Sequence, residues 1–161
     1  MDDNEVLAVI QASPPRRWMG VGMLAAIGVL VIYVALVAPP VPVWQAFLIV
    51  TGGLALWMAD RMRRATGYAI ELTRTELRDS SGELIARVSD IEKVESGFFA
   101  FKPSHGFLVR TRTPATRIWR PGLWWRFGRR IGVGGVTPRS QTKFMAEMLT
   151  AMIALRDQAS E

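Results

Sequence analysis

The feature that most constrains this chain is an uncharged apolar run from Trp18 to Val37, WMGVGMLAAIGVLVIYVALV. At a helical rise of about 1.5 Å per residue, this run is roughly 30 Å long, which matches the hydrocarbon core of a bilayer. A second run, Val43 to Ala59, reaches about 25 Å. Between the two lies APPVP, whose prolines stop helices. The pattern predicts a transmembrane hairpin over residues 18–60, with helices at 18–37 and 43–59.

Positive charges flank this hairpin at its two outer ends, whereas the connecting turn carries none. The flanking residues are Arg16, Arg17, Arg61, Arg63 and Arg64. Such residues stay in the cytoplasm. We therefore expect both termini to be cytoplasmic, with residues 1–17 as a cytoplasmic tail. The acidic leader and the prolines after the first run are atypical of a cleaved signal peptide, so we expect the first helix to be retained.

Small side chains recur at a spacing of four along both predicted helices. Gly22 and Ala26 share one face of the first helix, and Thr51, Ala55 and Ala59 share one face of the second. Small residues at this spacing allow close helix packing in lipid. We expect these faces to contact each other or the helices of partner subunits. Neither span contains an ionisable group, which argues against a proton relay or an ion path.

From residue 65 to about residue 157 the sequence changes to short alternating segments divided by turn residues. These segments predict antiparallel strands. The strands are expected at Tyr68–Thr73, Glu76–Asp79, Leu84–Val88, Ile91–Glu95, Phe107–Arg112, Arg117–Arg120 and Trp124–Val133, with a break at Thr113-Pro114.

A helix is predicted after these strands, with Thr137 as its N-cap, Pro138 in its first position and an end near Arg156. One apolar stripe is formed by Phe144, Met148, Met152 and Leu155, and it is widened by Met145, Leu149 and Ile153. The expected fold class is a membrane α-helical hairpin plus an α+β domain, in which six to seven antiparallel strands are capped by a C-terminal helix.

The order of these elements, with the segment Ile131–Pro138 leading into the last helix, resembles a bacterial pleckstrin-homology-like (PH-like) domain preceded by two transmembrane helices. The resemblance covers roughly residues 65–156. It implies a PH-like fold and an interaction scaffold with no reaction of its own. No phosphoinositide-type motif is present in the sequence, so the resemblance assigns no binding residue.

Charge is segregated along the chain, whose net charge is +6. From Phe98 to Lys143 there are ten basic residues and no acidic one. Near a membrane, arginines attract anionic lipid and tryptophans favour the headgroup level. The residues expected to contact lipid or a partner are Trp124, Trp125, Arg126, Arg129 and Arg130. The alternative is that the tryptophans fill the core and the arginines form a solvated sheet face.

Several kinds of chemistry are disfavoured by the residue types present. The chain has no cysteine and a single histidine, His105, which leaves no basis for thiolate or histidine metal clusters. The glycines of 132–135 lack the Lys-Ser/Thr of a phosphate-binding loop and predict a strand-to-helix turn. Basic residues with aromatics also occur in nucleic-acid-binding proteins, but no such fold signature is present. We therefore expect no catalytic, cofactor or metal site and no nucleic-acid partner.

Together these features predict a non-catalytic protein of the bacterial inner membrane that acts as an accessory or assembly subunit of a larger membrane complex. Its basic PH-like domain would dock on a partner or on lipid. The alternative is a stand-alone module that binds anionic lipid and organises the membrane. The high content of arginine, alanine and glycine is typical of a GC-rich bacterial genome.

Overall fold

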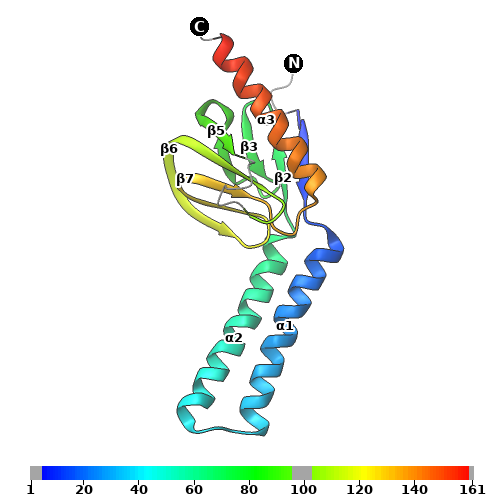
Figure 1. Ribbon diagram of the computed structural model, residues 1–161, viewed down its shortest axis with the longest axis vertical. Coiled ribbons are helices and arrows are strands. Elements are labelled where there is room, and N and C mark those ends of the chain that lie inside the picture. The colour runs from blue at the N-terminus through cyan, green and yellow to red at the C-terminus, as the bar shows by residue number, and fades with distance from the viewer. Residues whose placement is uncertain (1–4, 96–102, 160–161) are drawn as a thin grey trace.

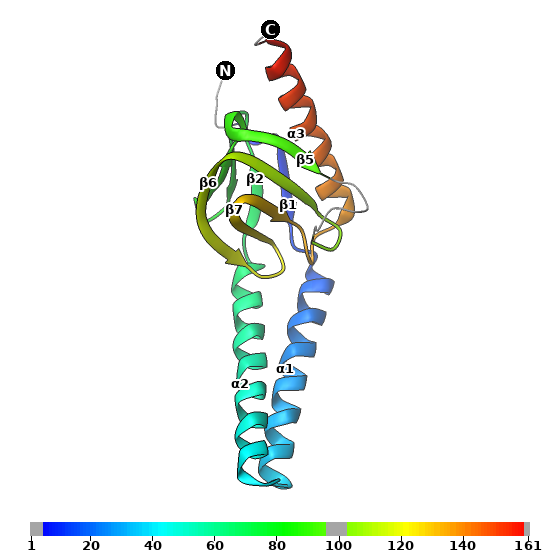
Figure 2. The same ribbon diagram turned by 60° about the vertical axis from the view of Figure 1, so that its left-hand side comes forward.

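In the computed structural model, which describes residues 5–95 and 103–159, a long helical hairpin carries an α+β domain at one end (Figure 1). These described residues form one strand, then the two helices of the hairpin, then six strands and a final helix. Figure 2 shows that β1 and α3, the first and last elements, lie on the domain side and that the hairpin extends away from it.

The hairpin consists of α1 (Pro14–Val37) and α2 (Pro42–Ala65), which contain both predicted spans. Each helix begins with proline in its first turn, where the missing N–H would have had no helical partner. Both helices are long and apolar enough to cross a membrane, and only 17% and 11% of their apolar windows are buried within the chain. Apolar surface this extensive is typical of a site covered by lipid or by a partner.

The two helices meet most closely at Gly28 and Gly52. A Cβ atom added to Gly28 would lie 2.9 Å from the carbonyl oxygen of Gly52, and a Cβ atom added to Gly52 would lie 2.8 Å from the carbonyl oxygen of Gly28. Backbones approach this closely only where no side chain stands between them. Near the turn, Gln45 Nε2 donates a hydrogen bond of 3.0 Å to the carbonyl oxygen of Ala35.

The face of α1 that was predicted to pack is not the face that contacts α2. Gly22 and Ala26 are exposed, and no atom lies within 4 Å of a Cβ atom built on Gly22. Gly28 comes six residues after Gly22, which places it about 240° further around the helix. On α2, where three residues were predicted to pack, Thr51 is exposed, Ala55 is half-buried and Ala59 is buried.

The domain contains two antiparallel sheets. The first has four strands in the order β1 (Ala8–Gln11), β2 (Ala69–Leu72), β3 (Glu76–Asp79) and β4 (Leu84–Arg87). The second has three strands in the order β5 (Ile91–Glu95), β6 (Phe107–Arg120) and β7 (Trp124–Val133). A short 3-10 turn, η1 (Val88–Asp90), connects the two sheets.

Strand β1 precedes the hairpin, in the segment that was predicted to be a tail. It pairs with β2, which follows the hairpin, so that Ile10 lies opposite Ile70 and is fully buried. The tail prediction is therefore corrected for 8–11, because these residues complete the first sheet. One sheet takes a strand from each outer end of the hairpin, so both ends must lie on the same side of any membrane that the hairpin crosses.

The predicted break at Thr113-Pro114 is also wrong, because β6 continues through it. The pairing register with β7 shifts between Arg110 and Ala115, so residues of β6 bulge out of the ladder there. Proline is tolerated at such bulges because its missing N–H has no ladder partner to lose. The carboxylate of Asp90 supports the bulge by accepting hydrogen bonds from Thr113 N and Oγ1. The start of the predicted basic segment, 98–102, lies outside the described residues.

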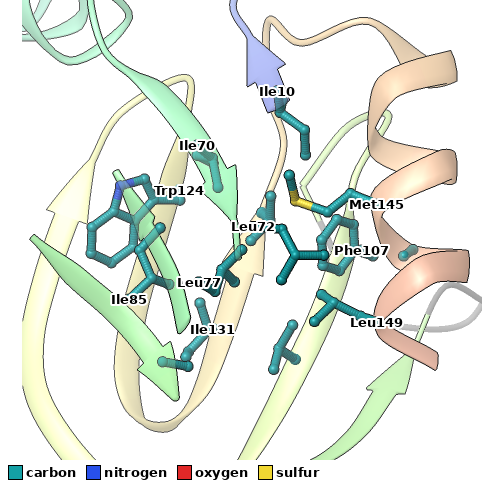
Figure 3. Close-up of a cluster of buried hydrophobic side chains, with 14 of the residues drawn as sticks. Ile10, Ile70, Leu72, Leu77, Ile85, Phe107, Trp124, Ile131, Met145 and Leu149 are labelled. Carbon is teal, nitrogen blue, oxygen red and sulfur yellow. The ribbon is translucent and has the colours of Figure 1, made fainter. Parts of the chain in front are cut away.

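Helix α3 (Arg139–Ala159) packs across the sheets, and Figure 3 shows its side chains facing those of both sheets in one core. Its buried face is Met145, Leu149 and Ile153, which was predicted to be the margin of the stripe. Phe144 and Leu155, which were predicted to be central, are exposed. Within the described part of the chain the hydroxyl of Thr137 makes no hydrogen bond, so the predicted N-cap contact does not form there.

Candidate functional site

The basic aromatic segment predicted to contact lipid is divided between the core and the surface. Trp124 is 1% exposed and belongs to the core, and Arg126 is 7% exposed. Neither side chain is available to lipid or to a partner, so the prediction is wrong for both. The reason is the alternation of β7, which turns these two side chains inward and Trp125 outward.

Arg126 connects the two sheets. Its Nε donates a hydrogen bond of 2.8 Å to the carbonyl oxygen of Thr116 on β6, and its Nη1 donates to the carbonyl oxygens of Leu84 and Ile85 at 2.7 and 3.0 Å. Glu83 lies 3.7 Å from its Nη2 and offsets the charge. A buried guanidinium is stable only when its donors are used in this way. The arginine thus holds the free edge of β4 against the second sheet.

Arg129 and Arg130 are exposed, which both the predicted contact and the alternative of a solvated sheet face require. Arg129 is nevertheless engaged, because its Nε donates to the carbonyl oxygen of Thr111 at 3.2 Å and its Nη2 donates to that of Arg112. Arg130 lies directly across from Arg110 in the ladder. Two cations at adjacent positions repel each other, and Glu92, 3.5 Å from Arg110 Nε, offsets one of the two charges.

A compact group of side chains lies on the outer face of the β6–β7 hairpin, and we call it the aromatic cluster: Arg117, Trp119, Trp125 and Phe127. Trp119 and Trp125 are directly opposed in the ladder, and the rings of Trp125 and Phe127 are 5.1 Å apart. The guanidinium of Arg117 lies 4.5 Å above the ring of Phe127. Only Trp125 of the four was predicted to be a contact residue. Period-two alternation from Trp119 through the turn would have identified the others.

The aromatic cluster adjoins the end of the domain that faces the hairpin. The β6–β7 turn lies against α2, since a Cβ atom on Gly122 would lie 2.9 Å from Thr66 Cγ2 and 3.3 Å from Met62 Cε. Arg120 bridges from this turn to the start of the first sheet, with its guanidinium 4.9 Å from the ring centre of Tyr68. In Figure 1 the same turn lies directly above α2.

Hydrogen bonds fix the start of α1 to this end of the domain and link α1 to α2. Ser13 N donates to the carbonyl oxygen of Val136 at 2.8 Å, and Arg16 Nη1 donates to that of Thr137 at 3.1 Å. Arg17 Nη2 links the two helices by donating to the carbonyl oxygen of Arg63 at 2.9 Å. The domain is therefore held in a defined position on the hairpin and is not connected to it by a flexible linker.

The helix ends beside the domain carry excess positive charge. Asp60 is the acidic residue there, and it forms ion pairs with Arg63 at 2.9 Å and Arg64 at 2.6 Å. Two further arginines lie over tryptophan rings, Arg17 over Trp18 and Arg61 over Trp57, as in the aromatic belt of a membrane interface. Arg16, Arg17 and Arg61 at these helix ends, and Arg117 on β6, are among the arginines that have no ion-pair partner within the described residues.

A groove of about 400 Å³ lies between β4 and the bulge of β6. It is lined by apolar side chains such as Ile85 and Ile131, together with Asp90 and Arg126. These two charged groups are already used, the first by Thr113 and the second by backbone carbonyls. Residues 5–95 and 103–159 contain no group of three or more metal-ligating side chains. Arg87 also lines the groove, and it is exposed and has no ion-pair partner among the described residues, so the groove offers apolar surface with one available cation.

The last two motifs considered in the sequence, His105 and the glycine pair 134–135, both lie in turns that pack against other segments. His105 lies in the turn before β6 and is exposed, and its carbonyl oxygen accepts a hydrogen bond of 2.6 Å from Thr142 Oγ1. The glycine turn before α3 crosses two other loops closely. A Cβ atom on Gly134 would lie 2.6 Å from Gly106 Cα, and a Cβ atom on Gly135 would lie 2.6 Å from the carbonyl oxygen of Gly122.

These features define an α+β protein with a helical hairpin whose apolar surface is exposed. The first sheet pairs a strand that precedes the hairpin with a strand that follows it. Comparison of the chain with family models, with curated proteins and with solved structures gave no match.

Proposed function

We propose that this chain is a non-catalytic interaction protein of the bacterial inner membrane, an accessory or assembly subunit of a larger membrane complex. In this proposal α1 and α2 span the membrane, both termini are cytoplasmic, and the domain docks on a partner or on lipid. The observation that carries the proposal is the pairing of β1 with β2 across an apolar hairpin. This pairing fixes a folded domain close to the surface of whatever the hairpin enters.

The orientation rests on the arginines at the domain end of the hairpin. Five arginines stand there against Asp60, and the opposite turn, 38–41, has no charge. Positive residues next to short spans remain on the cytoplasmic side. The domain would therefore fold in the cytoplasm, with the helix turn in the periplasm.

A PH-like fold is part of the proposal. Four antiparallel strands, then three, then a C-terminal helix against the core are consistent with that arrangement. The hairpin would be an insertion between the first and second strands. The proposal assigns no reaction to the domain, because its most buried charged groups have structural roles. Asp79 holds the β3–β4 turn through Ser81, and Arg126 joins the sheets.

Single introduced cysteines test the orientation, because the chain has none of its own. Val41→Cys lies in the helix turn and Leu155→Cys lies on α3, and both positions are exposed. With a membrane-impermeant maleimide on intact bacterial cells whose outer membrane is permeable to it, we expect Val41→Cys to react. Leu155→Cys should react only after the inner membrane is opened. The reverse pattern would overturn the orientation, and labelling of both sites in intact cells would contradict a spanning hairpin.

Purification of the tagged full chain in mild detergent tests the accessory-subunit role. We expect integral membrane subunits to co-purify in fixed proportion, identified by mass spectrometry. A lone chain with no companion would contradict this role. That result would favour the alternative of a module that binds anionic lipid by itself, for which the exposed aromatic cluster and the unpaired arginines are the supporting observations.

A further inference from the structure

The contacts of the β6–β7 turn with α2 show how far this turn lies, along the helix axis, from the apolar spans. Gly122 touches Met62 and Thr66, which come three and seven residues after Ala59, the last residue of the second uncharged run. At about 1.5 Å per residue, these contacts lie about 4.5 and 10 Å beyond that run. The polar headgroup region of one leaflet is about 5–8 Å thick. The first contact lies within this region and the second just beyond it, so in a bilayer spanned by the hairpin the turn lies at the outer part of the headgroup region.

The aromatic cluster is close to this turn. Trp119 and Trp125 each stand three residues from Gly122, so each Cα lies within about 10 Å of it along the strand. Trp119 is 39% exposed and Phe127 is 38% exposed, whereas Trp125 is half-buried, with its ring against Gly132. Tryptophan side chains with a free edge favour the membrane interface, where the ring is desolvated and the N–H stays hydrated.

Charge at the same level favours an anionic surface. Arg117 has no ion-pair partner among the described residues and is stacked on Phe127, so its guanidinium remains free to meet a phosphate. Arg61 at the end of α2, which lies over the ring of Trp57, extends the positive surface towards the apolar span. Arginines this close to a bilayer attract anionic lipid, and the attraction is weakened by salt.

We propose that the aromatic cluster of Arg117, Trp119, Trp125 and Phe127 rests among the headgroups of anionic lipids. The domain then binds the bilayer surface directly in addition to its covalent connection through the hairpin. This inference rests on the proposed function, because it requires the hairpin to span the membrane. Trp124 and Arg126, which the sequence predicted as contact residues, face inward, and the contact is assigned here to side chains on the outer face.

Tryptophan fluorescence of the full chain in lipid vesicles tests the contact, because brominated lipids quench only tryptophans close to them. The background protein replaces the hairpin tryptophans through Trp18→Phe, Trp44→Phe and Trp57→Phe. In vesicles containing phosphatidylglycerol and a phosphatidylcholine brominated near its headgroup, we expect the emission to be quenched. Adding Trp119→Phe and Trp125→Phe should abolish this quenching. Only the buried Trp124 then remains, and its unquenched emission reports a folded domain.

Charge is tested in the same vesicles. Raising the salt from about 0.1 M to about 1 M shortens the Debye length from about 10 Å to about 3 Å, which should reduce quenching. Replacing phosphatidylglycerol with zwitterionic lipid and introducing Arg117→Gln should each have the same effect. The matched control is Lys93→Gln, on β5 at the end of the domain away from the hairpin (Figure 2), and it should leave quenching unchanged.

The outcomes separate this inference from the proposed function. Quenching of the hairpin tryptophans in the unmodified chain without quenching of Trp119 and Trp125 would overturn the headgroup contact and retain the spanning hairpin. Absence of quenching at both places would overturn both. Protection of Trp119 from aqueous iodide by a co-purified subunit, without lipid quenching, would assign the aromatic cluster to a protein partner and would also overturn the inference.

Discussion

The glycine contact between α1 and α2 allows a quantitative test of the hairpin. Gly28→Ala would place a Cβ atom 2.8 Å from Leu56 Cγ and 2.9 Å from the carbonyl oxygen of Gly52, whereas ordinary contacts begin at 3.4 Å. The leucine can change rotamer, but the carbonyl oxygen belongs to the backbone. The helices must therefore separate by several tenths of an ångström along the contact.

The expected cost follows from matched substitutions in the same helices. Gly22→Ala and Gly53→Ala introduce the same methyl group where no atom lies within 4 Å. All three changes gain helix propensity, about 1 kcal/mol, which cancels in the comparison. Overpacking a closely packed contact costs about 1–3 kcal/mol. We therefore expect Gly28→Ala to be less stable than either control by about 1–3 kcal/mol, where each 1.4 kcal/mol is about tenfold in the equilibrium constant.

Reversible unfolding in mixed micelles with increasing sodium dodecyl sulfate, followed by tryptophan fluorescence, measures this difference. A result in which Gly28→Ala and Gly22→Ala have equal midpoints and slopes would refute the reasoning. It would mean that the two backbones are not held together at Gly28 and Gly52.

Three further substitutions are expected to destabilise the domain, each measured by denaturant unfolding of the full chain in mild detergent. Ile10→Ala removes a fully buried side chain of β1 and should cost about 2–5 kcal/mol. Arg126→Gln leaves backbone carbonyls of β4 and β6 without their donor and should cost about 2–4 kcal/mol. Arg156→Gln removes hydrogen bonds from α3 to the carbonyl oxygens of Val88 and Ile91 and should cost about 1–2 kcal/mol.

Each of these changes has a matched control on the same element, and each control should stay within about 0.5–1 kcal/mol of the unmodified chain. The controls are Val9→Ala on the outer face of β1, Arg130→Gln on β7 and Lys143→Gln on α3. Equal losses for Ile10→Ala and Val9→Ala would indicate that β1 is not part of the core. An Arg126→Gln protein as stable as Arg130→Gln would contradict the assignment of Arg126 as the connection between the sheets.

Local sequence patterns determined most of the elements. The long uncharged runs that became α1 and α2 have one stable solution in lipid, because every backbone polar group must be bonded within the segment. Strands β3 and β5 have the predicted bounds, since turn residues mark both ends of each. The final helix was also predicted, because its apolar residues recur with a helical period over many turns.

Long-range contacts decided the rest. The four residues of β1 are too short a segment to identify from their own pattern, and they form a strand because β2, on the other side of the hairpin, offers an edge. The burial of Arg126 and the exposure of Trp119 depend on which face of the β6–β7 hairpin meets the core. A bulge changes that face without changing the local pattern.

The sequence by itself determined where apolar surface and charge lie along the chain, because hydropathy and charge are properties of each residue. Only the tertiary structure decided which glycines join the helices, which arginine is buried and that one sheet joins the two outer ends of the hairpin. These outcomes depend on backbone packing between segments far apart in sequence, and local propensity does not encode such packing.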